Sequence, residues 1–266
     1  MHTPLHFLTI ENEGEHLVLK SASTYIRSAL DVMRHPALLF YSRRRTSSVF
    51  SIGLALFFSP GYTECMCSRY TLGKQDTEVF DAGEAALFRA RCARLGLTVA
   101  LSGEVAPSCL APVLAPSSLD RRPSLFPMQW GFAHPERKLT VINAKTETAQ
   151  EKELFRESTY TRRCLIPAAG FFEWKKEPDG RKTKTLFTGE GTKLLLGGLY
   201  IRASRLPLPV FVILTQPASE TVRPVHQRMP LLVAQTLADR FLDSAVPYET
   251  LLPLVMDTPV PLKVYG

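Results

Sequence analysis

The stretch CLIPAAGFFEWKK (residues 164–176) is the longest strand-like run in this chain of 266 residues. Such runs, rich in apolar, β-branched and aromatic residues and bounded by turn residues, are typical of β-strands. The others are MQWGFA (128–133), LTVINA (139–144), TKTLFT (183–188), KLLLGGLYI (193–201) and VFVILTQ (210–216). Strands dominate, and the helical segments between them follow no steady βαβ alternation. This pattern predicts an α+β fold with a mostly antiparallel, barrel-like sheet and flanking helices.

Three segments have the spacing or the termini of α-helices. In residues 81–96, apolar side chains recur at helical intervals as far as a glycine, a residue that commonly ends helices. Residues 146–158 are predicted to form a helix opened by a threonine or asparagine cap. Residues 235–243 are predicted to form a short, late helix. By contrast, residues 108–127 are rich in proline and serine, so we expect a surface loop there.

The composition is ordinary for a soluble globular protein, with 45% hydrophobic and 21% charged residues. The net charge of +7 fits an anionic partner, and most of the basic surplus lies after residue 65. No apolar run approaches the roughly 20 residues of a membrane-spanning helix. The five cysteines form neither a disulfide framework nor a CxxC pair, which indicates a reducing compartment. We expect a cytoplasmic monomer with no membrane partner, no metal and no cofactor.

Four stretches place polar or reactive side chains in apolar, strand-like surroundings. They are Cys67-Ser68-Arg69, Asn143 in INAKTETA (142–149), Glu173 in PAAGFFEWKK (167–176), and His226 with Arg228 in RPVHQRMPLLV (223–233). Cysteine, asparagine, glutamate and histidine together supply a nucleophile, a hydrogen-bond donor and two proton-transfer groups. Their spacing suggests a site without identifying its reaction.

Each of these residues also has a purely structural interpretation. Strand alternation alone would place Glu173 on the solvent face, opposite Phe172. Asn143 could cap the helix that follows it, and His226 could be an ordinary polar loop residue. A lone cysteine is most often a small buried hydrophobic side chain. Taken singly, the residues favour these structural interpretations.

From Met66 to about the C-terminus, the chain resembles the SOS response-associated peptidase (SRAP) family, whose members are also called abasic-site processing proteins. The resemblance rests on MCSRYTL, PMQWGF, INAKTETA, RRCLIPAAGFFEW and HQRMP, which occur in the family's order. It implies a single domain, residues 66–266, built around a barrel-like sheet. It also implies that this domain acts on abasic sites in single-stranded DNA during the DNA damage response, and that it is nucleoid-associated when bound.

The resemblance carries catalytic roles over to four residues. It implies that Cys67 becomes the first residue after methionine removal and acts as the nucleophile. Glu173 would move protons during imine formation, and His226 would assist opening of the sugar ring. Asn143 would orient the amine or the sugar.

The resemblance also implies a DNA-binding set. Arg69 and Arg228 match arginines that hold DNA phosphates. Trp130 resembles an aromatic residue that lies beside the bound DNA strand, where it could stack on a base. The alternative interpretation of Trp130 is an aromatic side chain of the core. Lys145 replaces the family's usual arginine, which keeps the charge but loses the bidentate fork. Ser68 replaces the usual glycine, a milder change.

The chemistry makes the amino terminus decisive. An abasic site opens to an aldehyde, which a 1,2-aminothiol captures as a Schiff base and then as a thiazolidine ring. Only an N-terminal cysteine presents both groups, because the nitrogen of an internal cysteine is an amide. The expected cross-link through Cys67 therefore requires Met66 to be the true start, or residues 1–65 to be removed. We favour a misassigned start, since residues 1–65 have no clear core pattern.

Two other functions stay open on the sequence. A thiol peptidase or autopeptidase could use Cys67 and His226 with Glu173 or Asn143 as a triad-like set, and it would need no free amine. A non-catalytic module could bind single-stranded DNA through the same basic surface without a covalent product. A lyase side reaction from the Schiff base is also compatible with cross-linking.

Overall fold

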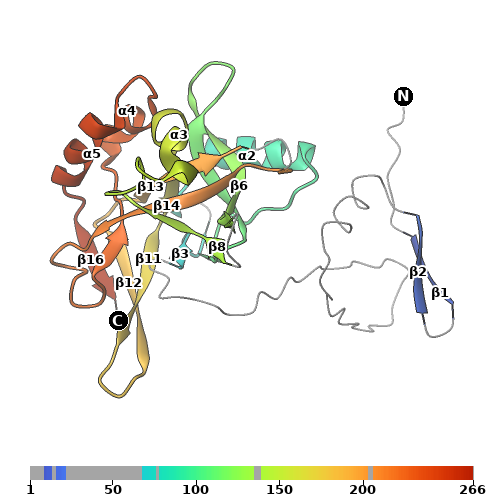
Figure 1. Cartoon of the computed structure of the whole chain (residues 1–266), viewed down its shortest axis with the longest axis horizontal. Coiled ribbons are helices and arrows are strands. Elements are labelled where there is room, and N and C mark those ends of the chain that lie inside the picture. Colours follow the sequence, from blue (N-terminus) through green and yellow to red (C-terminus); the bar gives the residue numbers. More distant parts are fainter. Residues whose placement is uncertain are drawn as a thin grey trace. The chain divides into compact units, whose positions relative to one another are not determined.

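A seven-stranded and a five-stranded sheet form the framework of the described chain, a computed structural model. The described residues are 9–13, 16–21, 68–75, 78–134, 139–202 and 206–265. The chain divides into a first unit, Met1–Pro60, and a second unit, Gly61–Gly266. In the first unit, β1 (Thr9–Glu13) and β2 (His16–Ser21) pair as an antiparallel hairpin. The elements that follow all belong to the second unit (Figure 1).

The larger sheet closes on itself. Its strands are β5 (Leu110–Pro116), β6 (Pro123–Trp130), β9 (Asn143–Lys145), β10 (Arg163–Ala168), β13 (Leu194–Ile201), β14 (Val210–Pro217) and β15 (Arg228–Pro230). Strands β13, β10, β5, β6 and β14 form a ring, because β14 also pairs with β13. Among the described strands, the parallel pairings are those of β14 with β6 and with β9. The predicted α+β fold with a mostly antiparallel, barrel-like sheet is confirmed.

The smaller sheet is antiparallel throughout. Its order is β16 (Leu262–Tyr265), β12 (Lys182–Gly189), β11 (Gly170–Lys176), β3 (Tyr70–Thr71) and β4 (Glu104–Val105). The run 164–176 is therefore divided between two sheets, since its first part is β10 and its second part is β11. A separate pair joins β7 (Phe132–Ala133) to β8 (Thr140–Val141).

Strand β14 of the ring is buried on both faces. On β14, Phe211 and Ile213 belong to one hydrophobic cluster, whereas Val212 and Leu214 belong to a second one. Successive side chains of a strand point to opposite faces, so both faces of this strand are covered. This double burial explains why residues 210–214 are apolar without alternation.

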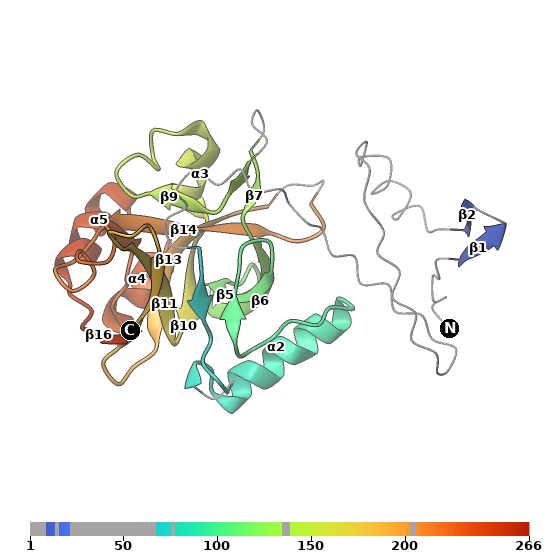
Figure 2. The same ribbon diagram turned by 90° about the horizontal axis from the view of Figure 1, so that it is seen from below.

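Helix α2 (Ala82–Arg94) confirms the first helix prediction. The side chain of Asp81 accepts the amide hydrogen of Glu84 at 2.8 Å, and the carboxylate of Glu84 accepts that of Asp81 at 3.1 Å, which forms a capping box. The helix ends just before Gly96, whose φ of 67° favours glycine. Figure 2 shows α2 running beside β5 and β6, where the guanidinium of Arg91 lies over the ring of Phe126.

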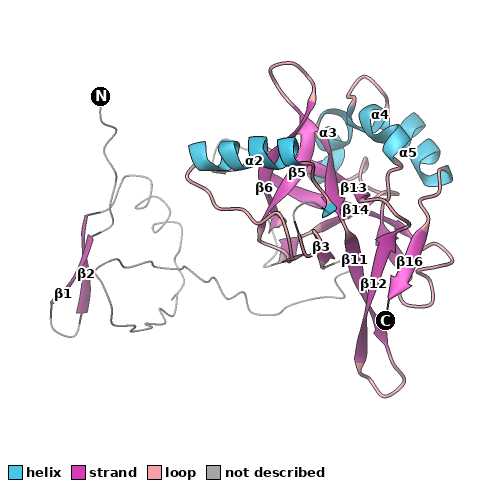
Figure 3. Cartoon of the chain, turned by 180° about the vertical axis from the view of Figure 1, so that it is seen from behind, coloured by secondary structure: helices cyan, strands magenta, loops and turns pink. Residues whose placement is uncertain are grey.

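Three further helices cover one face of the ring. They are α3 (Glu153–Thr161), α4 (Ala238–Leu242), which continues the 3₁₀ turn η2 (Gln235–Leu237), and α5 (Tyr248–Asp257). Phe155, Phe241 and Leu251 from these helices are buried in the same cluster as Val212 and Leu214. The three helices lie together on one side of the domain (Figure 3). The late helix predicted at 235–243 is confirmed, whereas α5 was not predicted.

The prediction of a surface loop at 108–127 is wrong, because this segment contains β5 and the start of β6. The prolines face one another in two pairs, which are Pro112 with Pro127 and Pro116 with Pro123. The amide of Ser117 donates to the carbonyl oxygen of Arg122 at the next rung, at 2.9 Å. Rungs of an antiparallel ladder alternate between bonded and non-bonded, so the prolines occupy non-bonded rungs. The missing N–H groups therefore cost this ladder nothing.

The helix predicted at 146–158 begins later than expected. Residues 146–151 form turns, and α3 starts at Glu153 after Lys152, which makes no side-chain cap bond. Asn143 does not cap this helix, because it is the first residue of β9. Pairing with β14 therefore takes precedence over helix formation at the start of this segment.

Gly198 lets β13 approach β14 closely where the ring closes. A Cβ atom there would lie 2.8 Å from the carbonyl oxygen of Val212 and 2.6 Å from Cδ1 of Ile166. Both distances are shorter than a van der Waals contact. Glycine is thus required by packing at this point of the ring.

Candidate active site

Strand β14 is flanked on its two edges by β9 and β15. On one edge, the amide of Ile213 donates to the carbonyl oxygen of Ile142, just before β9, at 3.0 Å. On the other edge, the amide of Leu231, just after β15, donates to the carbonyl oxygen of Leu214 at 2.8 Å. Adjacent residues of a strand bond to opposite sides, so β14 stands between β9 and β15.

Four of the predicted site residues lie on these flanking segments. Asn143 and Lys145 are the first and last residues of β9, and Arg228 is the first residue of β15. His226 precedes β15 by two residues. Asn143 and His226 are half-buried, and Lys145 is exposed. Residues far apart in the sequence are therefore brought to the two edges of one strand.

The ring of His226 folds back against the backbone of Arg228. Its Nδ1 lies 3.1 Å from both the amide nitrogen and the carbonyl oxygen of Arg228. Both groups point away from β14, because the neighbouring rung, where Ala218 donates to Gln227 at 3.0 Å, is the bonded one. Nδ1 can accept from the amide or, when protonated, donate to the carbonyl oxygen. Nδ1 thus has a partner in every protonation state, and Nε2 is the nitrogen left for proton transfer.

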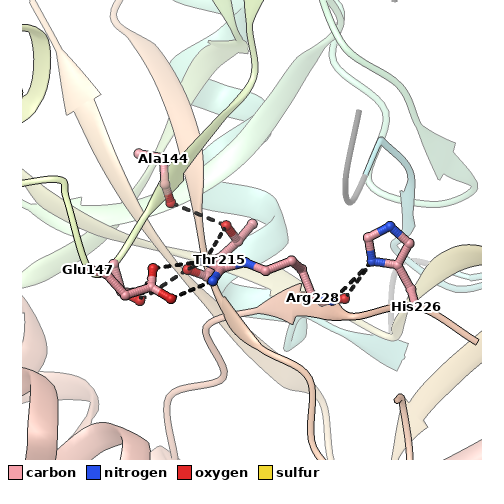
Figure 4. A network of polar contacts seen from close by, with 6 residues as sticks. Ala144, Glu147, Thr215, His226 and Arg228 are labelled. Atoms are coloured by element: carbon pink, nitrogen blue, oxygen red, sulfur yellow. Dashed lines mark hydrogen bonds and ion pairs between the residues drawn. The ribbon is translucent and has the colours of Figure 1, made fainter. Parts of the chain in front are cut away.

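The guanidinium of Arg228 is held by Glu147 and Thr215 (Figure 4). Its Nη1 donates to Oε1 of Glu147, and its Nη2 donates to Oε2 of Glu147 at 2.9 Å. Nη2 also donates to the carbonyl oxygen of Thr215 on β14, at 2.6 Å. The side chain of Arg228 is 15% exposed. The pair therefore reaches across β14 from the β15 edge to the segment after β9.

The charge of this pair is permanent near neutral pH. Hydrogen bonds from Arg228 lower the pKa of Glu147 to about 2, against a smaller opposing effect of burial. The carboxylate is therefore ionised at neutral pH. Charge-assisted, bidentate pairs of this kind are among the stronger side-chain interactions.

These contacts restrict how Arg228 can bind a DNA phosphate. A guanidinium has two forks, Nη1 with Nη2 and Nε with Nη2, and both use Nη2. Nη2 carries two hydrogens, which are donated to Glu147 and to Thr215. Among the described residues Nε has no hydrogen-bond acceptor, and it is buried. A bidentate contact between Arg228 and a phosphate would therefore require release of Glu147.

Trp130 lies in the core, which corrects the expectation that it could stack on a DNA base. Its side chain is 0% exposed. Ring centroids lie 5.3 Å from Tyr70 and 6.2 Å from Phe211, and Nε1 donates to the carbonyl oxygen of Ile142 at 3.0 Å. Strand β6 directs this side chain into the ring interior, so no face of the indole is available. The alternative, a core aromatic, is confirmed.

Arg69 and Glu173 belong to the smaller sheet. The amide of Phe172 donates to the carbonyl oxygen of Arg69 at 3.0 Å, which extends the pairing of β3 with β11 toward the amino terminus. Arg69 and Ser68 are half-buried. The segment that follows Cys67 therefore runs beside the strand of Glu173. The prediction for Cys67 itself lies outside the described residues.

Glu173 is buried, with 2% of its surface exposed. On β11 it points to the same face as the fully buried Phe171, while Phe172 and Trp174 are partly exposed. The alternative that placed Glu173 on the solvent face is therefore wrong. A carboxylate in such surroundings needs polar partners, and buried titratable groups of this kind are frequent in catalytic sites.

The sequence motifs do not single out Glu147 or Thr215. Glu147 lies in INAKTETA, the motif that also carries Asn143 and Lys145. Its place in this motif could have identified it as a candidate site residue. Thr215 is a polar residue at the end of an apolar run and is completely buried. No local pattern pairs either residue with Arg228.

Some kinds of site are not found among the described residues. No three histidine, cysteine, aspartate or glutamate side chains there are grouped as metal ligands would be. In the same residues, none of the helices combines the length and the apolar character needed to cross a bilayer. The described cysteines, Cys92, Cys109 and Cys164, are free thiols.

A protein-family comparison matches the second unit. The family described as SOS response associated peptidase (SRAP) matches residues 66–265. This range contains all five motifs of the sequence analysis and all candidate site residues. It begins one residue before Cys67.

Curated relatives align with part of the chain. The abasic site processing protein YoaM of Bacillus subtilis is 30% identical over 182 residues, which cover 64% of this chain and 75% of YoaM. YoqW of the same organism is 30% identical over 115 residues, covering 40% of this chain and 51% of YoqW. YedK of Escherichia coli is 29% identical over 131 residues, covering 47% and 58%. The chain thus spans about half to three quarters of the length of these relatives.

Two solved structures share the fold. A phage-related protein from Bordetella bronchiseptica superimposes with a TM-score of 0.57 at 21% identity, covering 75% of this chain and 93% of that chain. A protein from Bacteroides thetaiotaomicron superimposes with a TM-score of 0.60 at 18% identity, covering 75% and 91%. At these identities the likeness concerns the fold alone.

Proposed function

Because this chain belongs to the SRAP family, we propose that it binds abasic sites in single-stranded DNA and captures them covalently through Cys67, once that residue is N-terminal. The relatives YoaM and YedK are both named abasic site processing proteins. The product is a DNA–protein cross-link that protects the lesion during the DNA damage response.

The capture reaction starts from the open sugar, which carries an aldehyde at C1′. The α-amine of Cys67 adds to C1′ and water leaves, which gives a Schiff base. The sulfur then adds to the same carbon, its proton passes to the nitrogen, and a five-membered thiazolidine closes. The net reaction loses one water and needs no oxidant. Reference pKa values of about 7.7–8.0 for an α-amine and about 8.5 for a thiol make both reactive forms accessible near neutral pH.

The assigned residues have the groups that these steps need. His226 uses Nε2 to assist opening of the sugar ring, because its Nδ1 is occupied by the backbone of Arg228. Glu173 accepts and returns protons during imine formation. Asn143 orients the amine or the sugar. Arg69 and Lys145 contact phosphates, so binding weakens as the salt concentration rises.

The observation that carries the proposal is the arrangement of strands around β14. Two of its neighbours, β9 and β15, bring Asn143 and His226 to opposite edges of one strand. In the smaller sheet, the segment after Cys67 pairs with the strand of Glu173. Trp130 links the two sheets, because its ring lies 5.3 Å from that of Tyr70, the residue after Arg69, and its Nε1 donates to Ile142, the residue before Asn143. These contacts support a shared site for the nucleophile and the proton-transfer groups.

The decisive experiment uses a single-stranded oligonucleotide with one abasic site and a form of the protein that starts at Met66. We expect a heat-stable adduct whose intact mass equals protein plus oligonucleotide minus one water. Cys67→Ala should form none. The full chain with residues 1–65 attached is the matched control and should form none, because its Cys67 nitrogen is an amide.

Other outcomes would favour the alternatives. Peptide hydrolysis without an adduct would favour a thiol peptidase. Salt-sensitive DNA binding that Cys67→Ala leaves intact, without an adduct, would favour a binding module. The intact mass of protein made from the native gene tests the amino terminus directly. Mature protein that keeps residues 1–65 would contradict the cross-linking mechanism.

A further inference from the structure

The ion pair of Glu147 and Arg228 connects three strands of the larger sheet. Glu147 lies two residues after β9, and Arg228 begins β15. Between them, the carbonyl oxygen of Thr215 on β14 accepts a hydrogen from Arg228 Nη2 at 2.6 Å. The same oxygen accepts the amide hydrogen of Thr146 at 3.0 Å. The end of β9 and the start of β15 are thus fastened to a single residue of β14.

Arg228, the first residue of β15, lies at a non-bonded rung of the ladder with β14. The bonded rungs are those of Gln227 with Ala218, of Met229 with Gln216 and of Leu231 with Leu214. The rung of Arg228 with Pro217 lies between the first two. The first residue of this strand, Arg228, presents the backbone groups that face Nδ1 of His226. The main-chain groups of Arg228 therefore make no bond to β14, and its side chain is what fastens this residue to that strand.

We infer that Glu147 is a positioning residue for His226. By anchoring the guanidinium of Arg228 across β14, Glu147 holds the first residue of β15 in place. The backbone groups that contact Nδ1 of His226 are then kept at a fixed separation from Asn143 on β9. The inference rests on the proposed function, because it is the cross-linking reaction that gives His226 its task.

A different role for Glu147 leads to opposite expectations. If the carboxylate only occupied Arg228 until a DNA phosphate displaced it, removing its charge would tighten DNA binding and leave the chemical step unchanged or faster. If Glu147 positions His226, removing its charge slows the chemical step. The rate of cross-linking and the affinity for DNA therefore separate the two roles.

The first test measures amide hydrogen exchange by NMR in the full chain and needs no catalytic activity. In Glu147→Gln we expect the amides of Leu231 and Thr146, which bond to β14, to exchange about tenfold faster. The amide of Ala169, which bonds to Thr71 at 2.8 Å in the smaller sheet, should keep its rate. Unchanged exchange at Leu231 and Thr146 would overturn the inference, whatever the protein does to DNA.

The second test measures single-turnover cross-linking at saturating DNA with the form that starts at Met66. Glu147→Gln should lower the first-order rate about tenfold, within the range expected for disturbing general acid–base catalysis. Its Kd for the oligonucleotide should not increase. Glu151→Gln is the matched control, since it removes the same charge from an exposed residue in the same turn, and it should match the wild type.

A double-mutant cycle links the effect to the histidine. In a His226→Ala background, Glu147→Gln should cause no further loss of rate, because the group that it positions is absent. Equal losses in both backgrounds would contradict a role through His226. Glu147→Asp keeps the charge on a shorter side chain, so its cross-linking rate should lie between those of Glu147→Gln and the wild type. It replaces Glu147→Gln in these measurements if that variant folds poorly. If the wild type forms no adduct, the proposed function fails. The exchange measurement still tests whether the ion pair of Glu147 and Arg228 holds β9 and β15 against β14.

Discussion

The indole of Trp130 donates its Nε1 hydrogen to the carbonyl oxygen of Ile142, with the two atoms 3.0 Å apart. That oxygen also accepts the amide hydrogen of Ile213 on β14, at 3.0 Å. Ile142 links β8 to β9 and immediately precedes Asn143. A fully buried tryptophan is therefore one hydrogen bond away from the backbone that carries a candidate active-site residue.

Trp130→Phe should reduce stability and slow cross-linking while leaving DNA affinity unchanged. Phenylalanine keeps a ring beside Tyr70 but loses the donor to Ile142 and leaves a void. We expect the free energy of unfolding to fall by about 1–3 kcal/mol, as measured by urea denaturation. A loss of oligonucleotide affinity in the folded variant would instead indicate that the indole contacts DNA, against its burial.

The pair of Glu147 and Arg228 should stabilise the protein at neutral pH and lose this effect in acid. The folded-state pKa of Glu147, about 2, lies below its ordinary value of 4.5. A lowered pKa gives stability that is complete above the ordinary value and is lost as the pH falls toward the folded-state value. The difference in unfolding free energy between wild type and Glu147→Gln should therefore shrink between about pH 5 and about pH 2. Urea titrations across this range measure it, and a constant difference would contradict the assignment.

Gly198→Ala should be more destabilising than Gly197→Ala. At Gly198 a new Cβ would meet the carbonyl oxygen of Val212 at 2.8 Å, and the backbone of a ring strand cannot move aside. At Gly197 the nearest atoms are side-chain ends, Cδ2 of Leu231 at 3.0 Å and Cζ of Phe241 at 3.2 Å, which can shift. We expect Gly198→Ala to cost about 1–3 kcal/mol. Thermal unfolding of the two variants checks the order, and the reverse order would contradict the close approach of β13 and β14.

The fold could be predicted from the sequence wherever burial leaves a plain pattern. The run 210–214 is apolar throughout because its two faces meet two hydrophobic clusters. The segment 108–127 was missed because its prolines indicate a loop, and only the register places them at non-bonded rungs. The start of α3 was missed because Thr146 bonds to β14 and the residues after it form turns before the helix begins at Glu153. Such outcomes depend on which strands pair, and no local window contains that information.

The candidate site, too, could be predicted only in part from the sequence. Motifs identified Asn143, Glu173 and His226, but the partner of Arg228 is Glu147, at a sequence separation of 81 residues. Their contact exists because β9 and β15 flank β14, which is a property of the sheet topology. The burial of Trp130 likewise follows from the closure of the ring. Short motifs therefore identify candidate groups, whereas contacts between them depend on topology.

Lys145 should contribute one phosphate contact to DNA binding. It is exposed at the end of β9, where it stands in place of the arginine usual in the SRAP family. Lys145→Arg should tighten binding of a single-stranded oligonucleotide several-fold, because a guanidinium can bind phosphate with two parallel hydrogen bonds. Lys145→Glu should weaken binding for all sequences and reduce the slope of log K against log salt by about 0.7, the value for one contact on a single strand.

Fluorescence anisotropy over a range of salt concentrations measures both quantities for Lys145. Lys152→Glu is the matched control, because it changes the net charge equally at an exposed residue outside the strand. It should leave the salt slope unchanged. If Lys152→Glu and Lys145→Glu had the same effect, the loss would come from net charge, since a change in overall charge acts alike at any exposed position. A difference confined to Lys145 would place the phosphate at the end of β9, on the same edge of β14 as Asn143.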